Sequence, residues 1–274
     1  METGIGGQAA NLSPRLAALV STVRELAQAI IMPHYLSAVR RRKEDGSFLT
    51  EVDLKAQAAL VRSLKRIVNC PVLGEEMSGE EQLDLWEGGA DGLWCIDPID
   101  GTTNFAAGIP FFAVSVAFMR AGRSEMGVVY NPATDEAFFA ERGAGSFVNG
   151  NQLPLRASPG VLADCVAGVD FKRIPKPLAD RLALHPPYHS QRNFGCSALE
   201  WCYVAAGRLD LYLHGGQMLW DYCAGRLILE ESGGAFCSLT HDDFDADNLW
   251  KRSVIAGSNK ALFAGWRDWI RTHD

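Results

Sequence analysis

Apolar residues recur every three or four positions near both ends of the chain, a spacing that predicts amphipathic helices. The first begins at Ser13-Pro14, where serine suits the N-cap and proline the first helical position. Pro33 is expected to kink or end it. A second helix is predicted from Thr50 to near Cys70-Pro71, and a closing helix from about Asn259.

Shorter apolar runs between these helices predict strands. Residues 93–96 form an uninterrupted run typical of a buried strand, and residues 112–118, 126–130, 137–140 and 146–148 are separated by turn residues, as in an antiparallel meander. The second half alternates strand signals at 166–169, 209–213 and 253–256 with helix signals at 197–206 and 221–231. The segment after Glu75-Glu76 is expected to be an acidic loop. This pattern predicts a mixed α/β fold in layers.

Composition narrows the class of protein. The 274 residues are 47% hydrophobic, enough for a large core, and 33 acidic against 26 basic residues give a net charge of −7, which disfavours nucleic acid and anionic membranes as partners. The seven cysteines form no C-x-x-C pair and are expected to be reduced core residues. Because the N-terminus lacks a signal-peptide pattern and the apolar stretch 111–119 is too short to span a bilayer, we expect a cytoplasmic protein.

The strongest chemical signal is the segment Asp97-Pro98-Ile99-Asp100-Gly101-Thr102-Thr103-Asn104-Phe105, which follows the run at 93–96. Two carboxylates at the end of a buried strand repel each other and lose hydration unless a cation compensates them. Because two residues separate Asp97 from Asp100, a turn must bring both to one site, with the Ile99 carbonyl as a further oxygen ligand. Gly101 allows backbone N–H groups to approach a phosphate. The segment therefore predicts a magnesium site beside a phosphate.

Two magnesium ions ~3.5–4 Å apart suit the hydrolysis of a phosphate ester by activated water. The Thr102 hydroxyl is a candidate to orient that water and Glu75 to accept its proton. Outside this segment, each signal also has a structural interpretation. Thr50 and Asp53 fit a helix capping box, Glu75-Glu76 fits a solvated loop, and Asp221 at a helix start complements the helix dipole.

Four ordered motifs give the chain a close resemblance to the inositol monophosphatase family, within the lithium-sensitive, magnesium-dependent phosphatases. The motifs are Lys43 through Thr50 to Asp53; Gly74-Glu75-Glu76; Trp94 through Asp97-Pro98-Ile99-Asp100-Gly101-Thr102-Thr103-Asn104-Phe105; and Trp220-Asp221 through Ala224-Gly225 to Glu231-Ser232-Gly233-Gly234. The resemblance implies an α/β (α+β layered sandwich) fold like that of fructose-1,6-bisphosphatase, with alternating helix and sheet layers. It also implies a single phosphatase domain over 1–274, with approximate halves 1–150 and 151–274, two or three Mg²⁺ ions, lithium inhibition and a homodimer.

The same resemblance assigns roles to individual residues. The metal ligands map onto Glu75, Asp97, the Ile99 carbonyl, Asp100 and Asp221, and the water-activating pair onto Thr102 and Glu75, with Asp53 supporting the threonine. Gly101 and Thr102 map onto the groups that hold phosphate oxygens, and Gly195-Cys196-Ser197 onto the segment that contacts the substrate alcohol.

Position 214 departs from the family pattern. His214 stands where animal inositol phosphatases place a glutamate that binds the inositol ring. A histidine still hydrogen-bonds a hydroxyl but loses the charge-assisted contact, and a solvated histidine at a strand end is the structural alternative. We therefore expect inositol 1-phosphate or a related sugar phosphate, with fructose 1,6-bisphosphate, NADP, phosphoadenosine phosphate and histidinol phosphate as alternatives.

Two other functions compete with hydrolysis by activated water. Asp97 as a nucleophile would make the chain similar to haloacid-dehalogenase-like phosphatases, but their Asp-x-Asp-x-Thr spacing differs from that of Asp97 and Asp100. A regulatory binding protein that retains the ion site without turnover is the third hypothesis, and the intact candidate ligands weigh against it.

Overall fold

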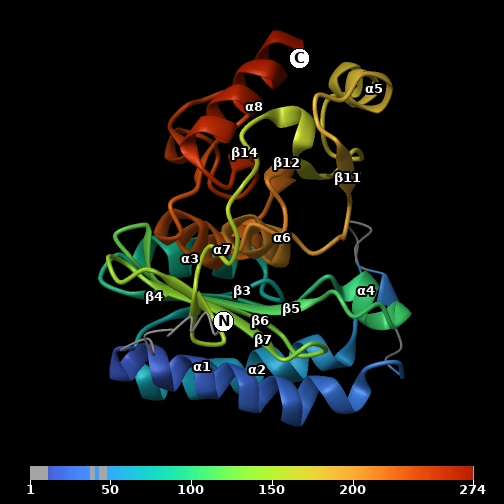
Figure 1. Cartoon of the computed structure of the whole chain (residues 1–274). Coiled ribbons are helices and arrows are strands. Elements are labelled where there is room, and N and C mark those ends of the chain that lie inside the picture. The colour runs from blue at the N-terminus through green and yellow to red at the C-terminus, as the bar shows by residue number, and fades with distance from the viewer. Residues whose placement is uncertain (1–11, 38–40, 43–47, 274) are drawn as a thin grey trace, which may run out of the picture.

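The computed structural model describes residues 12–37, 41–42 and 48–273. Helices and two sheets alternate in five layers (Figure 1). Part of the first family motif, Lys43 to Ser47, lies outside the described residues.

The first three layers enclose a seven-stranded sheet. Helices α1 (Pro14–Leu26) and α2 (Glu51–Ile67) cover one face, and α6 (Ser197–Ala205) and α7 (Leu219–Glu231) lie on the other (Figure 1). The sheet has the order β3 (Val72–Gly74), β4 (Leu93–Asp100), β5 (Ala113–Arg120), β6 (Arg123–Asn131), β7 (Glu136–Glu141), β8 (Ser146–Val148) and β9 (Asn151–Gln152). Only the β3–β4 pair is parallel among these described strands.

The remaining two layers are a five-stranded sheet and its outer helices. The strand order is β11 (Ser190–Arg192), β10 (Val166–Val169), β12 (Leu211–Gln217), β14 (Arg252–Gly257) and β13 (Ala235–Cys237). Helices α5 (Lys176–Leu184) and α8 (Lys260–His273) cover the outer face (Figure 1). The short pieces are β1 (Arg41–Arg42), β2 (Phe48–Leu49), α3 (Gly79–Gly88), α4 (Thr102–Ala107) and single turns at 27–31, 32–34, 162–164 and 244–246. The layered fold predicted from the sequence is confirmed.

Most predicted elements are found within a few residues of their expected limits. The first helix leaves α geometry before Pro33, because proline offers no N–H to the preceding turn, and residues 27–34 continue as π and 3₁₀ turns. The prediction of an acidic loop after Glu75-Glu76 is wrong. Helix α3 forms in this segment and is capped by reciprocal hydrogen bonds between Ser78 and Glu81. The seven cysteines are unpaired, as predicted, and all but Cys70 are buried.

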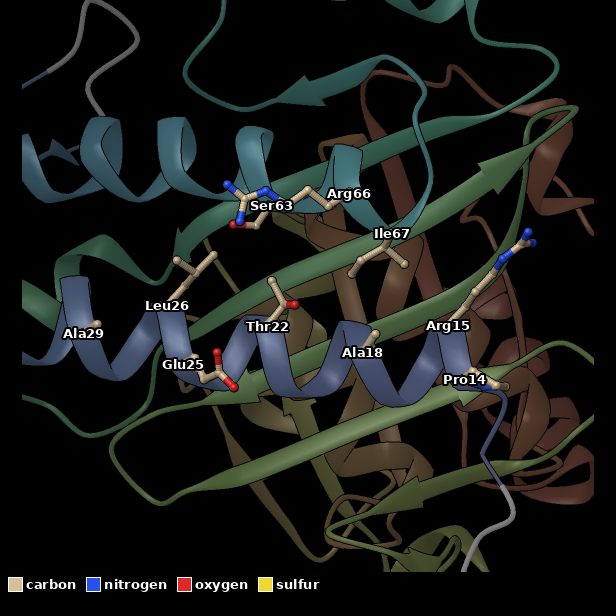
Figure 2. A pocket seen from close by; sticks show the side chains of 10 residues that line it. All are labelled: Pro14, Arg15, Ala18, Thr22, Glu25, Leu26, Ala29, Ser63, Arg66 and Ile67. Atoms are coloured by element: carbon tan, nitrogen blue, oxygen red, sulfur yellow. The ribbon is translucent and has the colours of Figure 1, made fainter.

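One described helical segment of 21 residues, Pro14–His34, is long and apolar enough to cross a membrane by length and composition, with a mean hydropathy of 1.3 over an 18-residue window. Its buried side chains, among them Leu19 and Val23, join the core between the first layer and the seven-stranded sheet. A groove of about 620 Å³ lies between this segment and α2, lined by residues such as Thr22, Glu25 and Arg66 (Figure 2). None of the predicted site residues lines it.

The packing of α7 on the seven-stranded sheet positions the middle layer. Ser115 Oγ donates to the Trp220 carbonyl at 3.1 Å, and Ser124 Oγ donates to the Cys223 carbonyl at 2.8 Å. Gly127 lies so close to the helix that a Cβ there would be 3.1 Å from Ala224 backbone atoms. These contacts fix the start of α7 over the end of β4.

Candidate active site

The end of β4 holds two carboxylates at an irregularity of the strand. The register of β4 against β5 shifts between Asp97 and Asp100, and the Ile99 N–H donates to Asp97 Oδ1 at 2.9 Å. This local bond breaks the alternation of the strand, so both carboxyl groups lie on one side of the chain. The two carboxylates come together as expected, but at a register irregularity within β4, which runs to Asp100, and not in the predicted turn.

Asp221, at the start of α7, completes the acidic cluster. The carboxylate oxygens of Asp97, Asp100 and Asp221 lie within 4.8 Å of one another. Asp97 is fully buried, whereas Asp100 and Asp221 are half-buried and open to a ligand. Three hard oxygen donors this close are the donor set that a magnesium-sized cation takes.

Each half-buried carboxylate is held by backbone amides on one oxygen. Ala198 N–H donates to Asp100 Oδ2 at 2.6 Å, and the Cys196 thiol donates to the same atom at 3.2 Å. Met218 N–H donates to Asp221 Oδ2 at 2.9 Å. The second oxygen of each group therefore remains for a cation.

Burial and mutual repulsion raise the pKa of all three carboxyl groups. Burial, followed by the charges of Glu75, Asp100 and Asp221, raises the pKa of Asp97 well above its usual range. Burial and the charge of Asp100 do the same for Asp221, and burial raises the pKa of Asp100 to about 6 against the opposing Ala198 amide. A cation would relieve these repulsions, so the electrostatics match the donor set.

Glu75 follows β3 and joins the cluster from the neighbouring strand. Its N–H donates to the Ile96 carbonyl at 3.2 Å, and its carboxyl contacts that of Asp97. Two glutamines that the sequence reasoning missed clamp this turn: Gln57 Oε1 accepts from Glu76 N–H at 3.1 Å, and Gln82 Nε2 donates to the Gly74 carbonyl at 3.0 Å. Both glutamines are buried, and a polar residue on the apolar face of a predicted helix was the available signal for Gln57.

Asp53 forms the predicted capping box, and its side-chain hydrogen bonds to described residues are to Thr50 and not to Thr102, the threonine that it was expected to support. Its Oδ2 accepts from the Thr50 amide at 2.8 Å and from the Thr50 hydroxyl at 2.5 Å. Oδ1 is buried and has no partner among the described residues, and the charge of Glu75 adds to the burial that raises the pKa of Asp53. An unpaired buried carboxylate oxygen beside Glu75 fits a cation or water ligand.

The turn after Asp100 places Thr102 and Gly101 beside the carboxylates. Thr102 Oγ1 donates to the Ile99 carbonyl at 3.0 Å, which leaves the second lone pair of that carbonyl for another ligand. Gly101 has a φ of +86°, and a Cβ there would lie 3.2 Å from the Phe111 carbonyl oxygen and from Cys196 Cβ. Glycine is therefore required at this position for both its conformation and its space.

The segment Gly195-Cys196-Ser197 packs directly against this turn. The Gly195 carbonyl would be 3.3 Å from a Cβ at position 101, and Ser197 begins α6. Asn104, buried in α4, donates through Nδ2 to the carbonyls of Phe111 and Phe194, each at 2.7 Å. The predicted substrate segment thus lies at the acidic cluster.

His214 is not the solvated strand-end residue that was one alternative. It is 1% exposed, and Nδ1 accepts from the Gly216 amide at 3.1 Å. Nε2 lies 3.1 Å from Arg173 Nη1 and 3.4 Å from Asp170 Oδ2. Burial lowers the pKa of the imidazole.

Comparisons with known proteins agree with this arrangement. The family model described as the inositol monophosphatase family matches residues 11–269. Nus factor SuhB of Haemophilus influenzae is 35% identical over 81% of this chain and 82% of its own length, and inositol monophosphatase 1 of Bos taurus is 34% identical over 81% and 80%. Among solved structures, Thermotoga maritima IMPase aligns with a TM-score of 0.80 at 27% identity, covering 95% of this chain and 97% of that one.

Proposed function

Because the chain belongs to the inositol monophosphatase family, whose members are metal-dependent phosphoric monoester hydrolases, we propose that it hydrolyses a small sugar phosphate, inositol 1-phosphate or a relative, with activated water. The observation that carries the proposal is the convergence of Asp97, Asp100 and Asp221 from β4 and α7. Their shared need for a cation and the neighbouring glycine turn suit a phosphate ester.

The cation that we propose is Mg²⁺, in two or three positions. Asp97, Asp100, Asp221 and Glu75 would supply carboxylate oxygens, and the Ile99 carbonyl a neutral one. Bound magnesium supplies Lewis acidity toward the phosphate ester. The three carboxylates whose oxygens lie within 4.8 Å of one another, and the unpaired Asp53 Oδ1, support this assignment.

The chain's own groups would position the water and receive its proton. Thr102 Oγ1 donates its hydrogen bond to the Ile99 carbonyl, so the lone pairs of the hydroxyl oxygen are available to accept a hydrogen bond from water. In this proposal Glu75 acts as the general base, and Asp53 supports Thr102 through its unpaired Oδ1. The amides of Gly101 and Thr102 would hold phosphate oxygens, while Gly195, Cys196 and Ser197 face the alcohol.

A substrate panel tests the reaction class. Purified protein is assayed for phosphate release from inositol 1-phosphate, fructose 1,6-bisphosphate, NADP, phosphoadenosine phosphate and histidinol phosphate, with Mg²⁺ or with EDTA. We expect Mg²⁺-dependent release from at least one sugar phosphate, and no release from any compound would refute the proposal. Trapping a phosphorylated Asp97 by acid quench would instead support the nucleophilic mechanism.

The relatives named Nus factor SuhB favour a second candidate, a regulatory binding role in addition to catalysis. Affinity capture with the full chain tests it: a specific partner retained by a hydrolytically inactive Asp100→Asn variant would support a role independent of turnover. We also propose one phosphatase domain, a homodimer and a cytoplasmic protein without nucleic-acid or membrane partners. Light scattering after size exclusion measures the oligomeric state.

A further inference from the structure

A second charged cluster lies where β10 and β12 run side by side. Val169, the last residue of β10, pairs with Leu213, and the residues that follow them, Asp170 and His214, bring two titratable side chains to the same point. Asp170 Oδ2 lies 3.1 Å from Arg173 Nη1 and 3.4 Å from His214 Nε2. Asp170 is 6% exposed and His214 1% exposed, whereas the Arg173 side chain is 57% exposed.

The hydrogen bonds of the cluster fix the state of the imidazole. Because His214 Nδ1 accepts from the Gly216 amide, the ring proton lies on Nε2, which donates to Asp170. Arg173 Nη1 donates to the same Asp170 oxygen, so the carboxylate anchors both donors. Both nitrogens of His214 are therefore used inside the protein, and the buried ring offers no donor or acceptor to a substrate.

Arg173 is held beside the acidic site by its backbone as well. A Cβ on Gly215 would lie 1.6 Å from the Arg173 carbonyl oxygen, so the two backbones touch, and the chain from Gly215 reaches Asp221 in six residues. On its other side, β10 lies against α6, because a Cβ on Gly168 would be 3.9 Å from Glu200 Oε1, and the same helix donates its Ala198 amide to Asp100. The segment after β10 that carries Arg173 therefore lies between the start of α6 and the strand that leads to Asp221.

The exposed guanidinium is only partly used by its ion pair. Among the described residues it has one hydrogen bond, from Nη1 to Asp170 Oδ2, and Nε and Nη2 have no partner there. Arg226 shows the contrast: it is 12% exposed, and its three nitrogens all bond carboxylates of Glu230 and Asp245. In the structural ion pairs of Arg226, carboxylates occupy all three guanidinium nitrogens. Arg173 instead has two guanidinium nitrogens, Nε and Nη2, in the planar geometry that binds an anion through two hydrogen bonds.

Resting on the proposed phosphatase function, we propose that Arg173, anchored by Asp170 and His214, binds an anionic group on the alcohol portion of the substrate. The site then prefers phosphomonoesters that carry a second phosphate or a carboxylate. In a chain of net charge −7 with a cluster of carboxylates, such an anion requires a local cation. The buried histidine contributes by holding Asp170, and thus acts as a positioning residue.

Two matched substrate pairs test the inference. Fructose 1,6-bisphosphate against fructose 1-phosphate isolates a second phosphate, and 2-phosphoglycerate against glycerol 2-phosphate isolates a carboxylate. The measured quantity is the ratio of kcat/KM within each pair, for wild type and Arg173→Gln. Losing a charge-assisted hydrogen bond is expected to lower the ratio about 10-fold or more in at least one pair, mainly through KM.

Control variants separate recognition from structure. Arg156→Gln removes a 47% exposed arginine that pairs with buried Asp210 at 3.3 Å, and we expect it to leave the ratios unchanged. Arg173→Lys keeps the charge without the fork and is expected to restore part of the preference. Thermal melting of each variant verifies folding.

A binding measurement keeps this inference distinguishable from the proposed function. Dissociation constants for the four compounds are measured by calorimetry with Ca²⁺ in place of Mg²⁺. If no compound is hydrolysed but wild type binds the doubly anionic member tighter and Arg173→Gln does not, the phosphatase proposal fails and this inference stands. Equal binding and equal kcat/KM within both pairs, or ratios unchanged by Arg173→Gln, overturn it.

Discussion

Replacing Asp100 by asparagine is expected to stabilise the metal-free protein while it abolishes turnover. Asp100 is forced to ionise in a half-buried site beside other carboxylates, where burial raises its pKa from 3.8 to about 6. Asparagine keeps an oxygen for the Ala198 amide, which bonds Asp100 Oδ2 at 2.6 Å, and removes the charge. The variant therefore loses a ligand for the proposed cation and, at the same time, a half-buried negative charge that is repelled by its neighbours.

The magnitude and its sign follow from proton linkage. The folded protein binds the Asp100 proton more tightly than the unfolded chain, so stability present at low pH is lost as pH rises from about 4 through about 6. The displacement of the pKa corresponds to roughly 3 kcal/mol of unfolding free energy at pH 8, and to about half of that at pH 5. Partial exposure reduces this, so we expect a gain of roughly 1–3 kcal/mol, or about 2–8 °C in Tm.

The assay is thermal unfolding in EDTA from pH 5 to pH 8. Asp100→Asn should melt above wild type, with a difference that grows with pH, and added Mg²⁺ should stabilise wild type far more than the variant. Asp210→Asn is the matched control, because Asp210 is 1% exposed but paired with Arg156 and the Val166 amide, so its loss should destabilise. A variant at position 100 that melts below wild type in EDTA at pH 8 would refute the reasoning.

Three further outcomes are expected. Gly101→Ala should lower kcat at least 10-fold and lower the free energy of unfolding by about 1–3 kcal/mol, measured by chemical denaturation. Gly143→Ala is the control, because Gly143 has a φ of +77° but open space around it, and it should cost only about 1 kcal/mol. Equal effects of the two substitutions would contradict the steric argument. Gln57→Leu removes the Oε1 atom that accepts from the Glu76 amide. It should lower kcat, measured by kinetics, and lower the free energy of unfolding by about 1–3 kcal/mol, measured through Tm. An unchanged kcat would show that the turn at Glu75 and Glu76 does not depend on Gln57. Asp221→Asn should abolish phosphate release and the Mg²⁺-induced rise in Tm; a retained rise would remove Asp221 from the proposed ligands.

The layers could be predicted because the pattern of apolar residues differs between their elements. The continuous run of β4 and the short runs of the meander require burial on a sheet, and the spacing in α1, α2 and α8 requires one buried face. Segments with weaker patterns were missed: α3 is stabilised by its cap at Ser78 more than by apolar periodicity, and it has one buried residue, Gln82. The edge strands β11 and β13 are three residues long, too short for alternation to mark them.

The acidic cluster could be predicted in part, because two of its three carboxylates are close together in the sequence. Asp97 and Asp100 lie at the same irregular end of β4, so their proximity follows from local geometry. Asp221 is more than a hundred residues away, and without the family resemblance its capping role explained it equally well. The supports of the site come from still more distant contacts, such as the Ala198 amide on Asp100, and no local pattern encodes them.

His214 shows that a residue can align with a substrate-binding position of a family without making the same contact. A glutamate there would carry charge toward a substrate, whereas the neutral, buried imidazole of His214 turns its donor to Asp170. Asp170 in turn fixes Arg173, and burial that would raise the pKa of Asp170 is outweighed by the bond from His214 and the nearby cation, which hold it at about 2. In the proposed site, an anchored positive charge on Arg173 therefore stands where the family pattern gives a negative one. This reversal of charge, rather than the loss of one hydrogen bond, is the physical reason to expect a substrate with a second anionic group.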